Sequence, residues 1–379
     1  MSQHHRCRAC RRGTGEIVLD LGRQPAADHF PAASDPGPDP TYPLQMWLCG
    51  ACGLAQLLED PTVPEEPRGA EPQALVDQAA NAVTRVAAAG WLPPGGRVAE
   101  YGSPHGGSWL ALLVEQGLTP VGDDEPADVV LDCFGLMHDA DQAAGLAVRA
   151  GRVAPEGVLL LQYHSLATIV RLGQWNALRH GHYAYYSTTA LRRMLATVGF
   201  VPRQAWRFDL YGGTVLLAAT RSDAGGVAGR DDSGIGEVLA EEVALGVEDP
   251  RRVRSLQRMA ATRADALRQW LADQAEAGVT VLGYGAASRA VALLCRAGVD
   301  RSLLPAVADA SPAKQGRRMP ATDIPVVAPG ELIAARPDVV ALFLPDLLQE
   351  LRGAYPEVEA AGGQWIDVDA LGPVPNTES

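Results

Sequence analysis

The chain contains very little lysine: Lys314 is the only lysine among its 32 basic residues, so arginine carries almost all of the positive charge. Acidic residues outnumber basic ones by 45 to 32, which gives a formal net charge of −13 at pH 7. The basic residues are scattered, and they form no cluster that could outweigh this negative charge at a phosphate backbone. The composition therefore excludes a nucleic-acid partner.

Long hydrophobic runs are also missing. No stretch approaches the roughly 20 apolar residues of a membrane helix. The chain opens on polar residues, Met1 to Arg6, without the apolar segment of a secretory signal. These features predict a cytoplasmic protein that does not bind membranes. Because the cytoplasm keeps thiols reduced, clustered cysteines need an explanation other than disulfides.

Four of the six cysteines form two pairs with CxxC spacing, Cys7 with Cys10 and Cys49 with Cys52. Thiolates at this spacing can face one tetrahedral zinc ion, and two such pairs supply four ligands. A redox-active CxxC is the alternative interpretation. A site with four thiolates has no open position, so the sequence predicts a structural zinc.

The length of 379 residues is typical of two or three domains. A Pro/Glu-rich stretch at 61–71 and a Gly/Asp/Ser-rich stretch at 221–234 indicate linkers. We therefore expect three modules, at 1–62, 72–222 and 236–379.

The second and third modules both alternate strand-like and helix-like segments, which predicts an α/β class for each. In the second, a strand at 97–101 leads through a glycine-rich turn into a helix at 108–117. In the third, a strand at 280–282 leads through Gly283 to Arg289 into another helix. The shared strand, turn and helix predict two Rossmann-like units.

Glycines in such turns let a cofactor approach the backbone, and the following helix N-terminus favours negative charge. In the second module, Glu100, Gly102 and Gly106 are the candidate cofactor-binding residues. An ordinary glycine turn is the alternative.

The corresponding turn of the third module contains Gly283 and Gly285. Asp309 follows about 24 residues later, just after the next predicted strand, where an acidic side chain can reach a ribose hydroxyl. Lys314 and Arg317 come soon after it. We predict that these five residues bind a nucleotide or phosphate, in preference to a solvated group of charges.

A third candidate site lies at 179–187, where two histidines and three tyrosines follow a predicted helix. Histidine suits general acid–base chemistry near neutral pH, so His180 and His182 are candidate catalytic residues. A surface turn with aromatic packing is the alternative. Arg179, beside both histidines, would disfavour their protonated forms and so favour a neutral base.

Together these motifs resemble the zinc-containing, S-adenosylmethionine-dependent C-methyltransferases that act on nucleotide-linked (dTDP-type) deoxysugars in antibiotic biosynthesis. The resemblance covers nearly the whole chain. It is carried by the segments Val18–Gly22, Cys49–Leu54, Tyr185–Ser187, Gly283–Ala286 and Lys314–Arg317. It implies a zinc module, a methyltransferase-like Rossmann domain, and a C-terminal Rossmann-like domain that helps to hold the sugar nucleotide.

The middle module departs from the family pattern at two motifs. The family carries a YxYxS segment that embraces the methyl donor, whereas the stretch Glu65–Asn81 contains no tyrosine. The family's Tyr-His-Glu-His run is Arg179-His180-Gly181-His182 here. The resemblance implies that its final histidine, His182, is the general base.

The middle module is also shorter than the family pattern. Only residues 123–127 separate the segment ending at Gly122 from the strand predicted at 128–132. Five residues cannot form a parallel crossover, which needs a dozen or more. The sequence therefore predicts a truncated sheet that lacks the helix and third strand of a methyltransferase, with Asp123, Asp124 or Glu125 left to reach the donor's ribose.

Three functions are compatible with this pattern. The first is a C-methyltransferase with a reduced donor site, acting on a keto-deoxysugar nucleotide in secondary metabolism. The second is a donor-free epimerase or isomerase of a keto-sugar nucleotide that uses a histidine base. The third is a non-catalytic sugar-nucleotide binder or partner subunit. The pattern does not indicate an oligomeric state.

Overall fold

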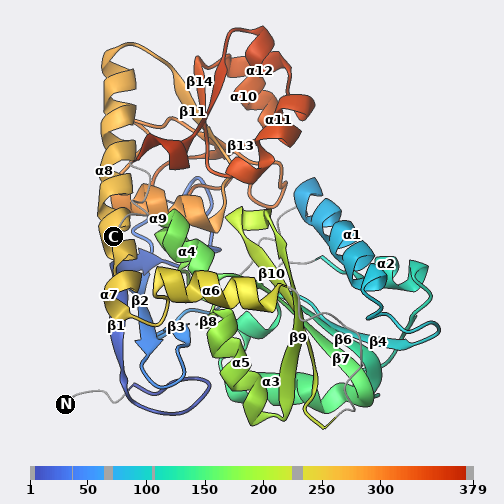
Figure 1. Ribbon diagram of the computed structural model, residues 1–379. Helices are drawn as coiled ribbons and strands as arrows, with labels where there is room; N and C mark the ends of the chain where they lie inside the picture. The colour runs from blue at the N-terminus through green and yellow to red at the C-terminus, as the bar shows by residue number, and fades with distance from the viewer. Residues whose placement is uncertain (1–4, 36, 64–70, 105–106, 224–233, 373–379) are drawn as a thin grey trace.

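The structure is a computed structural model, and it describes residues 5–35, 37–63, 71–104, 107–223 and 234–372. Its strands form three sheets of four, six and five strands (Figure 1). The fold class is mixed α/β, with the four-cysteine module at the N-terminal end. The second and third sheets lie within the second and third expected modules, whereas the first sheet takes one strand from the middle of the chain.

The first sheet is antiparallel and has the order β1-β2-β3-β8. Its strands are β1 (Gly15–Pro25), β2 (Thr41–Cys49), β3 (Ala55–Leu57) and β8 (Ala184–Tyr185). The last of these comes from the middle of the chain, where Tyr185 pairs with Ala55. The sequence pattern predicts neither these strands nor this pairing, which attaches the segment that contains His182 to the zinc module.

The second sheet has the order β5-β4-β6-β7-β10-β9. The strands β4, β5, β6 and β7 are parallel, and β10 runs antiparallel to both of its neighbours. The strands are β4 (Arg97–Tyr101), β5 (Thr119–Pro120), β6 (Ala127–Cys133), β7 (Val153–His164), β9 (Phe200–Phe208) and β10 (Thr214–Arg221). The helices of this module are α1 (Gln73–Ala88), α2 (Leu110–Glu115), α3 (Gln142–Arg152), α4 (Leu166–Leu172) and α5 (Thr188–Thr197), with short 3-10 turns η1 (Leu136–His138), η2 (Trp175–Ala177) and η3 (Leu210–Gly212).

The short link before β6 does join two parallel strands, contrary to the expectation from its length. Both β5 and β6 pair in parallel with β4, on opposite sides of it. The link is long enough because β5 has only two residues, paired with Arg97 and Val98 at the amino-terminal end of β4. Between β5 and β6 the chain therefore does not have to return along the full length of a strand. No helix and no further strand separate β5 from β6, so the predicted truncation of the sheet is confirmed.

The third sheet is fully parallel, with the order β13-β12-β11-β14-β15. Its strands are β11 (Val281–Tyr284), β12 (Val307–Ala308), β13 (Val326–Val327), β14 (Val339–Leu342) and β15 (Gln364–Asp367). The remaining helices are α6 (Ile235–Leu245), α7 (Pro250–Val253), α8 (Ser255–Glu276), α9 (Ser288–Ala297), α10 (Pro329–Ala335), α11 (Leu348–Ala354) and α12 (Glu357–Ala360), with 3-10 turns η4 (Pro345–Leu347) and η5 (Val368–Leu371).

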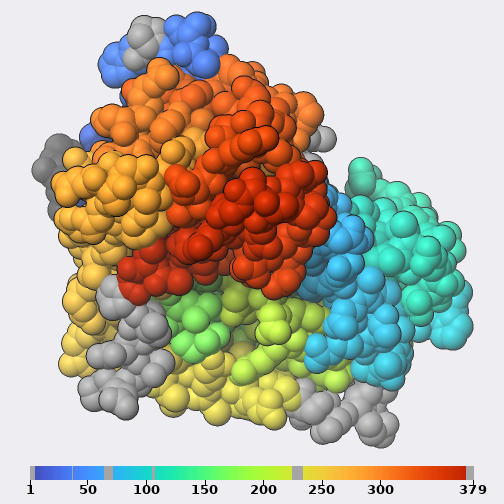
Figure 2. Space-filling view, turned by 90° about the horizontal axis from the view of Figure 1, so that it is seen from above, coloured from blue at the N-terminus to red at the C-terminus, as the bar shows by residue number. Residues whose placement is uncertain are grey.

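The long helix α8 joins the two ends of the molecule, since it runs beside β1 and up to the C-terminal sheet (Figure 1). One apolar core includes Leu19 of β1, Leu256 of α8 and Val291 of α9, so the first and third modules share their interior. In Figure 2 the C-terminal residues (orange to red) lie against α1 (light blue). None of the described helices is long and apolar enough to cross a membrane.

Candidate functional site

The four paired cysteines come together as the sequence predicts. The Sγ atoms of Cys7, Cys10, Cys49 and Cys52 all lie within 4.8 Å of one another. The Cys7–Cys52 distance is 3.5 Å and the Cys10–Cys49 distance is 3.6 Å. Zinc–sulfur bonds of about 2.3 Å in a tetrahedron place neighbouring sulfurs about 3.8 Å apart. The set therefore fits a four-coordinate zinc without an open position.

A cavity of about 340 Å³ lies at the carboxyl ends of β4, β6 and β7, the edge where ligands bind in parallel sheets. All three modules line it: Asp28 belongs to the first, Asp132 and His182 to the second, and Arg289 and Lys314 to the third. A functional site in this cavity therefore requires the whole assembled chain.

His182 faces this cavity, and its imidazole is held by an arginine. The Nε of Arg179 donates a hydrogen bond of 2.8 Å to Nε2 of His182, and Nη1 of Arg179 lies 3.0 Å from Oδ1 of Asp28. A guanidinium has only donors, so Nε2 must accept, which requires a neutral imidazole with its proton on Nδ1. In this geometry the imidazole of His182 is neutral.

His138 is a cavity residue that the sequence pattern does not single out. It ends the 3-10 turn η1 after β6, and its ring lies edge to face with that of His182, with centroids 4.8 Å apart. The backbone N–H of Tyr183 donates to the carbonyl of the neighbouring Met137. The two histidines are 44 positions apart, so no local motif links them.

His180 does not line the cavity. It is 5% exposed, its Nε2 lies 3.0 Å from the carbonyl oxygen of Pro43, and its ring packs edge to face on Tyr42. Burial lowers the pKa of His180. These contacts anchor the segment 179–187 to β2 of the first module, and a catalytic role for His180 stays a prediction.

The acidic residue of the first glycine turn, Glu100, accepts hydrogen bonds from residues that follow the turn. The Glu100 carboxylate accepts hydrogen bonds of 2.5 Å from the Ser108 hydroxyl and 2.6 Å from the Trp109 N–H. Neither Glu100 nor Gly102 lines the cavity, whereas Ser103 and Gly107 of the same turn do. Gly106 lies outside the described residues.

The acidic residues of the short link also lie outside the cavity lining. Asp123, Asp124 and Glu125 do not line it. The Glu125 carboxylate accepts from the backbone N–H of Gly122, and Arg152 donates to the carbonyl oxygen of Glu125, next to the start of β7. The link lies at the amino-terminal end of the sheet, so these residues cannot replace the missing ribose ligand.

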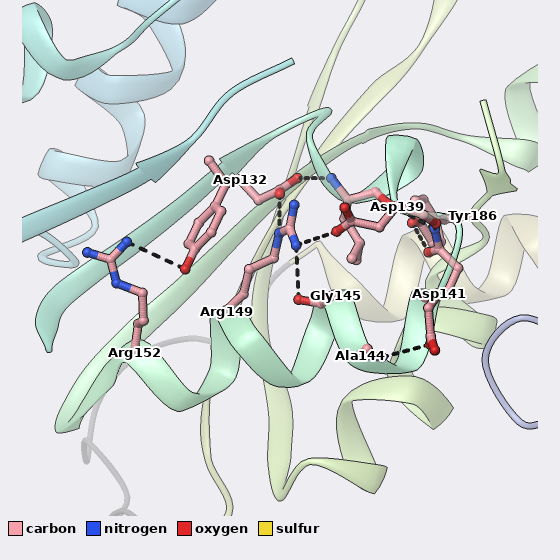
Figure 3. Close-up of polar contacts among 11 residues, drawn as sticks. Asp132, Asp139, Asp141, Ala144, Gly145, Arg149, Arg152 and Tyr186 are labelled. Atoms are coloured by element: carbon pink, nitrogen blue, oxygen red, sulfur yellow. Dashed lines mark hydrogen bonds and ion pairs between the residues drawn. The ribbon is translucent and has the colours of Figure 1, made fainter. Parts of the chain in front are cut away.

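A buried ion-pair network supports the cavity wall instead (Figure 3). Asp132 is the second-last residue of β6, and its carboxylate accepts hydrogen bonds of 2.5 Å from Arg149 Nε and 3.1 Å from the Leu136 N–H. Nη1 of Arg149 reaches Asp139 at 2.6 Å and the Gly145 carbonyl at 2.9 Å. Burial raises the pKa of the Asp132 carboxyl group, and the Arg149 guanidinium opposes that effect. The network fixes the loop that carries His138.

Two residues beside this network have strained backbones, Phe134 at the start of the same loop and Tyr211 in η3. Phe134 and Tyr211 both adopt left-handed backbone conformations, with φ of +58° and +56°, and their rings lie 6.1 Å apart. Both line the cavity, together with His164, whose pKa burial and the nearby Arg289 lower to about 3. Left-handed conformations cost non-glycine residues about 1–3 kcal/mol each and cluster at functional sites.

Two of the predicted nucleotide-binding residues of the third module, Asp309 and Arg317, bond to the backbone of the protein itself. Asp309 accepts from the backbone N–H of Ala286 and of Ser311, both at 2.8 Å, so it closes the turn after β11. Arg317 donates to the Phe30 carbonyl at 2.6 Å and so joins this loop to the first module.

Lys314 alone of the five predicted nucleotide-binding residues lines the cavity. Its ammonium donates to the Ala286 carbonyl at 2.8 Å and lies 3.6 Å from Asp309 Oδ2. Arg289, at the start of α9, adds a second cation, with its guanidinium 5.4 Å from the Tyr211 ring centre. Gly283 and Gly285 lie against Phe343 and Leu344 outside the cavity.

Two family models match this chain. "Putative zinc binding domain" covers residues 7–66, and "C-methyltransferase C-terminal domain" covers residues 209–368. The C-methyltransferase NovU of Streptomyces niveus is 23% identical over 403 residues, which cover 95% of this chain and 94% of that protein.

Solved structures similar to this chain include two methyltransferases. One is magnesium protoporphyrin IX methyltransferase from Synechocystis PCC 6803 with bound SAH (14% identity, TM-score 0.30), a match that covers 40% of this chain and 84% of that one. The other is the 1,6-didemethyltoxoflavin-N1-methyltransferase of Burkholderia thailandensis (14% identity, TM-score 0.29), with 45% and 96% covered. Residues 7–66 and 209–368 are therefore similar to a zinc-binding domain and to the C-terminal domain of C-methyltransferases, and the chain is similar to the C-methyltransferase NovU along nearly its whole length.

Proposed function

We propose that this protein transfers a methyl group from S-adenosylmethionine to the carbon next to the ketone of a nucleotide-linked, dTDP-type keto-deoxysugar in the cytoplasm. The observation that carries the proposal is the neutral imidazole of His182 in a cavity lined by all three modules. The similarity to the C-methyltransferase NovU supports the methyl transfer.

The reaction begins with removal of a proton from the carbon next to the ketone. A neutral imidazole can take that proton, and the electron pair of the broken C–H bond moves toward the ketone oxygen to form an enolate. His182 is the candidate base, and His138 faces it from the other side. Since Arg179 occupies Nε2 of His182, this guanidinium must turn toward the enolate oxygen when the base acts, where its positive charge stabilises the developing negative charge.

The phosphates of the sugar nucleotide need positive charge nearby. Lys314 and Arg289 provide it on the wall formed by the third module. In this arrangement Gly283, Gly285, Asp309 and Arg317 shape and anchor the loops that present these two cations.

S-adenosylmethionine supplies an electrophilic methyl group when it is bound. Ser103 and Gly107 of the glycine turn, with Trp109, would hold it at the carboxyl end of β4. Buried polar atoms without hydrogen-bond partners at this end of the sheet, described below, fit a polar ligand here. Glu100 would act indirectly, because its carboxylate holds the turn in place.

A donor-free isomerase that uses the same base is the second candidate. It is favoured by the truncated sheet, because the acidic residues that follow β5, Asp123, Asp124 and Glu125, do not line the cavity. Both candidates require proton removal next to the ketone, and only the first requires the donor.

The test is to incubate a 4-keto-deoxysugar nucleotide with the protein in D₂O, with and without S-adenosylmethionine. We expect deuterium next to the ketone without the donor, and a product heavier by one methyl group with it. His182→Asn should slow both by at least about 100-fold. His180→Asn tests the second candidate histidine, and His5→Asn, outside the cavity, is the control that should keep the rates within a few-fold. Deuterium exchange without methylation would establish the isomerase, and the absence of both reactions would refute an enzymatic function.

A further inference from the structure

Two glutamine side chains meet in the cavity and leave polar atoms without partners. Gln162, near the carboxyl end of β7, is 2% exposed, and its Nε2 donates a hydrogen bond of 2.9 Å to Oε1 of Gln78 on α1. Both residues line the cavity. Among the described residues, Gln162 Oε1 and Gln78 Nε2 are buried and have no hydrogen-bond partner.

This pair presents the same chemistry whichever way the amides are oriented. Oxygen and nitrogen of a side-chain amide can be exchanged by a flip. If both amides flip, Gln78 donates to Gln162, and one NH₂ group and one carbonyl oxygen again remain unused. The pair therefore always offers one donor and one acceptor. Burying these two groups without partners costs free energy, and a ligand with complementary groups would recover it.

The position of the pair indicates what that ligand is. The wall formed by α1 and the first glycine turn includes Glu71, Gln78, Ser103, Gly107 and Trp109. It contains no lysine or arginine among the described residues. The three cations of the cavity, Arg179, Arg289 and Lys314, come from other segments. A ligand with phosphates belongs near those cations, so the glutamine wall suits a ligand without them.

We propose that Gln78 and Gln162 bind the amino-acid end of the methyl donor, its α-ammonium and α-carboxylate groups; this rests on the proposed function. The free amide NH₂ donates to the carboxylate, and the free amide carbonyl accepts from the ammonium. A neutral amide pair matches a zwitterion, since it offers a partner to each charge. The carboxylate of Glu71, on the same wall, adds attraction for the ammonium.

Calorimetric titration with three probes tests this assignment. S-adenosylhomocysteine carries the amino-acid end, 5′-methylthioadenosine has the same adenosine and sulfur without it, and thymidine diphosphate represents the sugar nucleotide. We expect Gln162→Leu and Gln78→Leu each to weaken the binding of S-adenosylhomocysteine about tenfold or more. The affinities for the other two probes should not change. Gln204→Leu is the matched control, because Gln204 accepts from the Trp91 indole outside the cavity.

The thymidine diphosphate titration also shows whether each variant is folded. Equal S-adenosylhomocysteine binding in the wild type and both variants would overturn the assignment and leave the proposed function intact. Weaker thymidine diphosphate binding with unchanged S-adenosylhomocysteine binding would place the nucleobase at the two glutamines. That result would also overturn the assignment. If the wild type binds thymidine diphosphate but not S-adenosylhomocysteine, methyl transfer itself fails, and the assignment fails with it.

Discussion

Arg179 donates from Nε to Nε2 of His182 at 2.8 Å while its Nη1 lies 3.0 Å from Asp28. The guanidinium thus links a carboxylate of the zinc module to the candidate base of the middle module. It is 8% exposed, so little water screens this interaction. The arginine occupies the first position of the family's Tyr-His-Glu-His run and acts on the residue at the last one.

Removing this guanidinium should change the pH dependence of proton exchange. In Arg179→Gln we expect the exchange rate in D₂O to fall about tenfold or more at neutral pH, because the imidazole loses its orientation. The acid limb of the profile should move to higher pH, because a cation beside Nε2 opposes protonation. Arg179→Lys is the control, since it keeps the charge and should keep the acid limb. A profile and rate identical to those of the wild type would contradict this role.

The zinc site should be required for folding. In Cys49→Ser we expect loss of bound zinc and a fall in the free energy of unfolding of at least about 3 kcal/mol, because metal affinity contributes directly to folding. Zinc content by atomic emission and denaturant unfolding measure the two effects. Cys295→Ser, in α9 and outside the cluster, should keep one zinc per chain. Normal zinc content and solubility in Cys49→Ser would argue against the site.

Loss of the Asp132–Arg149 ion pair should lower the free energy of unfolding. Both side chains are at most 6% exposed, so Arg149→Met leaves a buried carboxylate without its cation. We expect a loss of about 3–5 kcal/mol in the free energy of unfolding. The double variant Asp132→Asn/Arg149→Met should recover part of that loss because it removes the isolated charge. Urea unfolding measures both, and a loss below about 1 kcal/mol in the single variant would show that the pair is not coupled.

Stability should decrease in mild acid. Burial lowers the pKa of His164 to about 3 and also lowers that of His180, so the unfolded chain binds protons at a higher pH than the folded one. The stabilisation is complete above about pH 6.5 and is lost as the pH falls from there toward 3, by up to about 1.4 kcal/mol per pH unit for each group. Urea unfolding at pH 7 and pH 5 should show the decrease, and His164→Gln should reduce it. An equal decrease in the variant would refute the assignment to His164.

The secondary structure that the sequence predicts best consists of long segments with a clear apolar period. The strand expected at 97–101 is β4, the strand at 128–132 lies within β6, and the helix expected at 108–117 contains α2. The zinc cluster follows from cysteine spacing because all four ligands belong to two local turns. By contrast, the pattern does not predict α6, which begins at Ile235 just after the expected linker at 221–234; residues 224–233 of that linker lie outside the described chain.

The sequence by itself determined the four-cysteine zinc site, the α/β character of the two larger modules and the truncation of the middle sheet, because each depends on residues close together in the chain. Only the tertiary structure decided which polar residues face the cavity. It turned Glu100 and Asp309 toward backbone N–H groups of their own or a neighbouring loop, since a carboxylate beside such donors is satisfied there. It also brought His138 against His182 and Gln78 against Gln162. These pairings depend on how β6, β7 and α1 pack, which no local sequence pattern records.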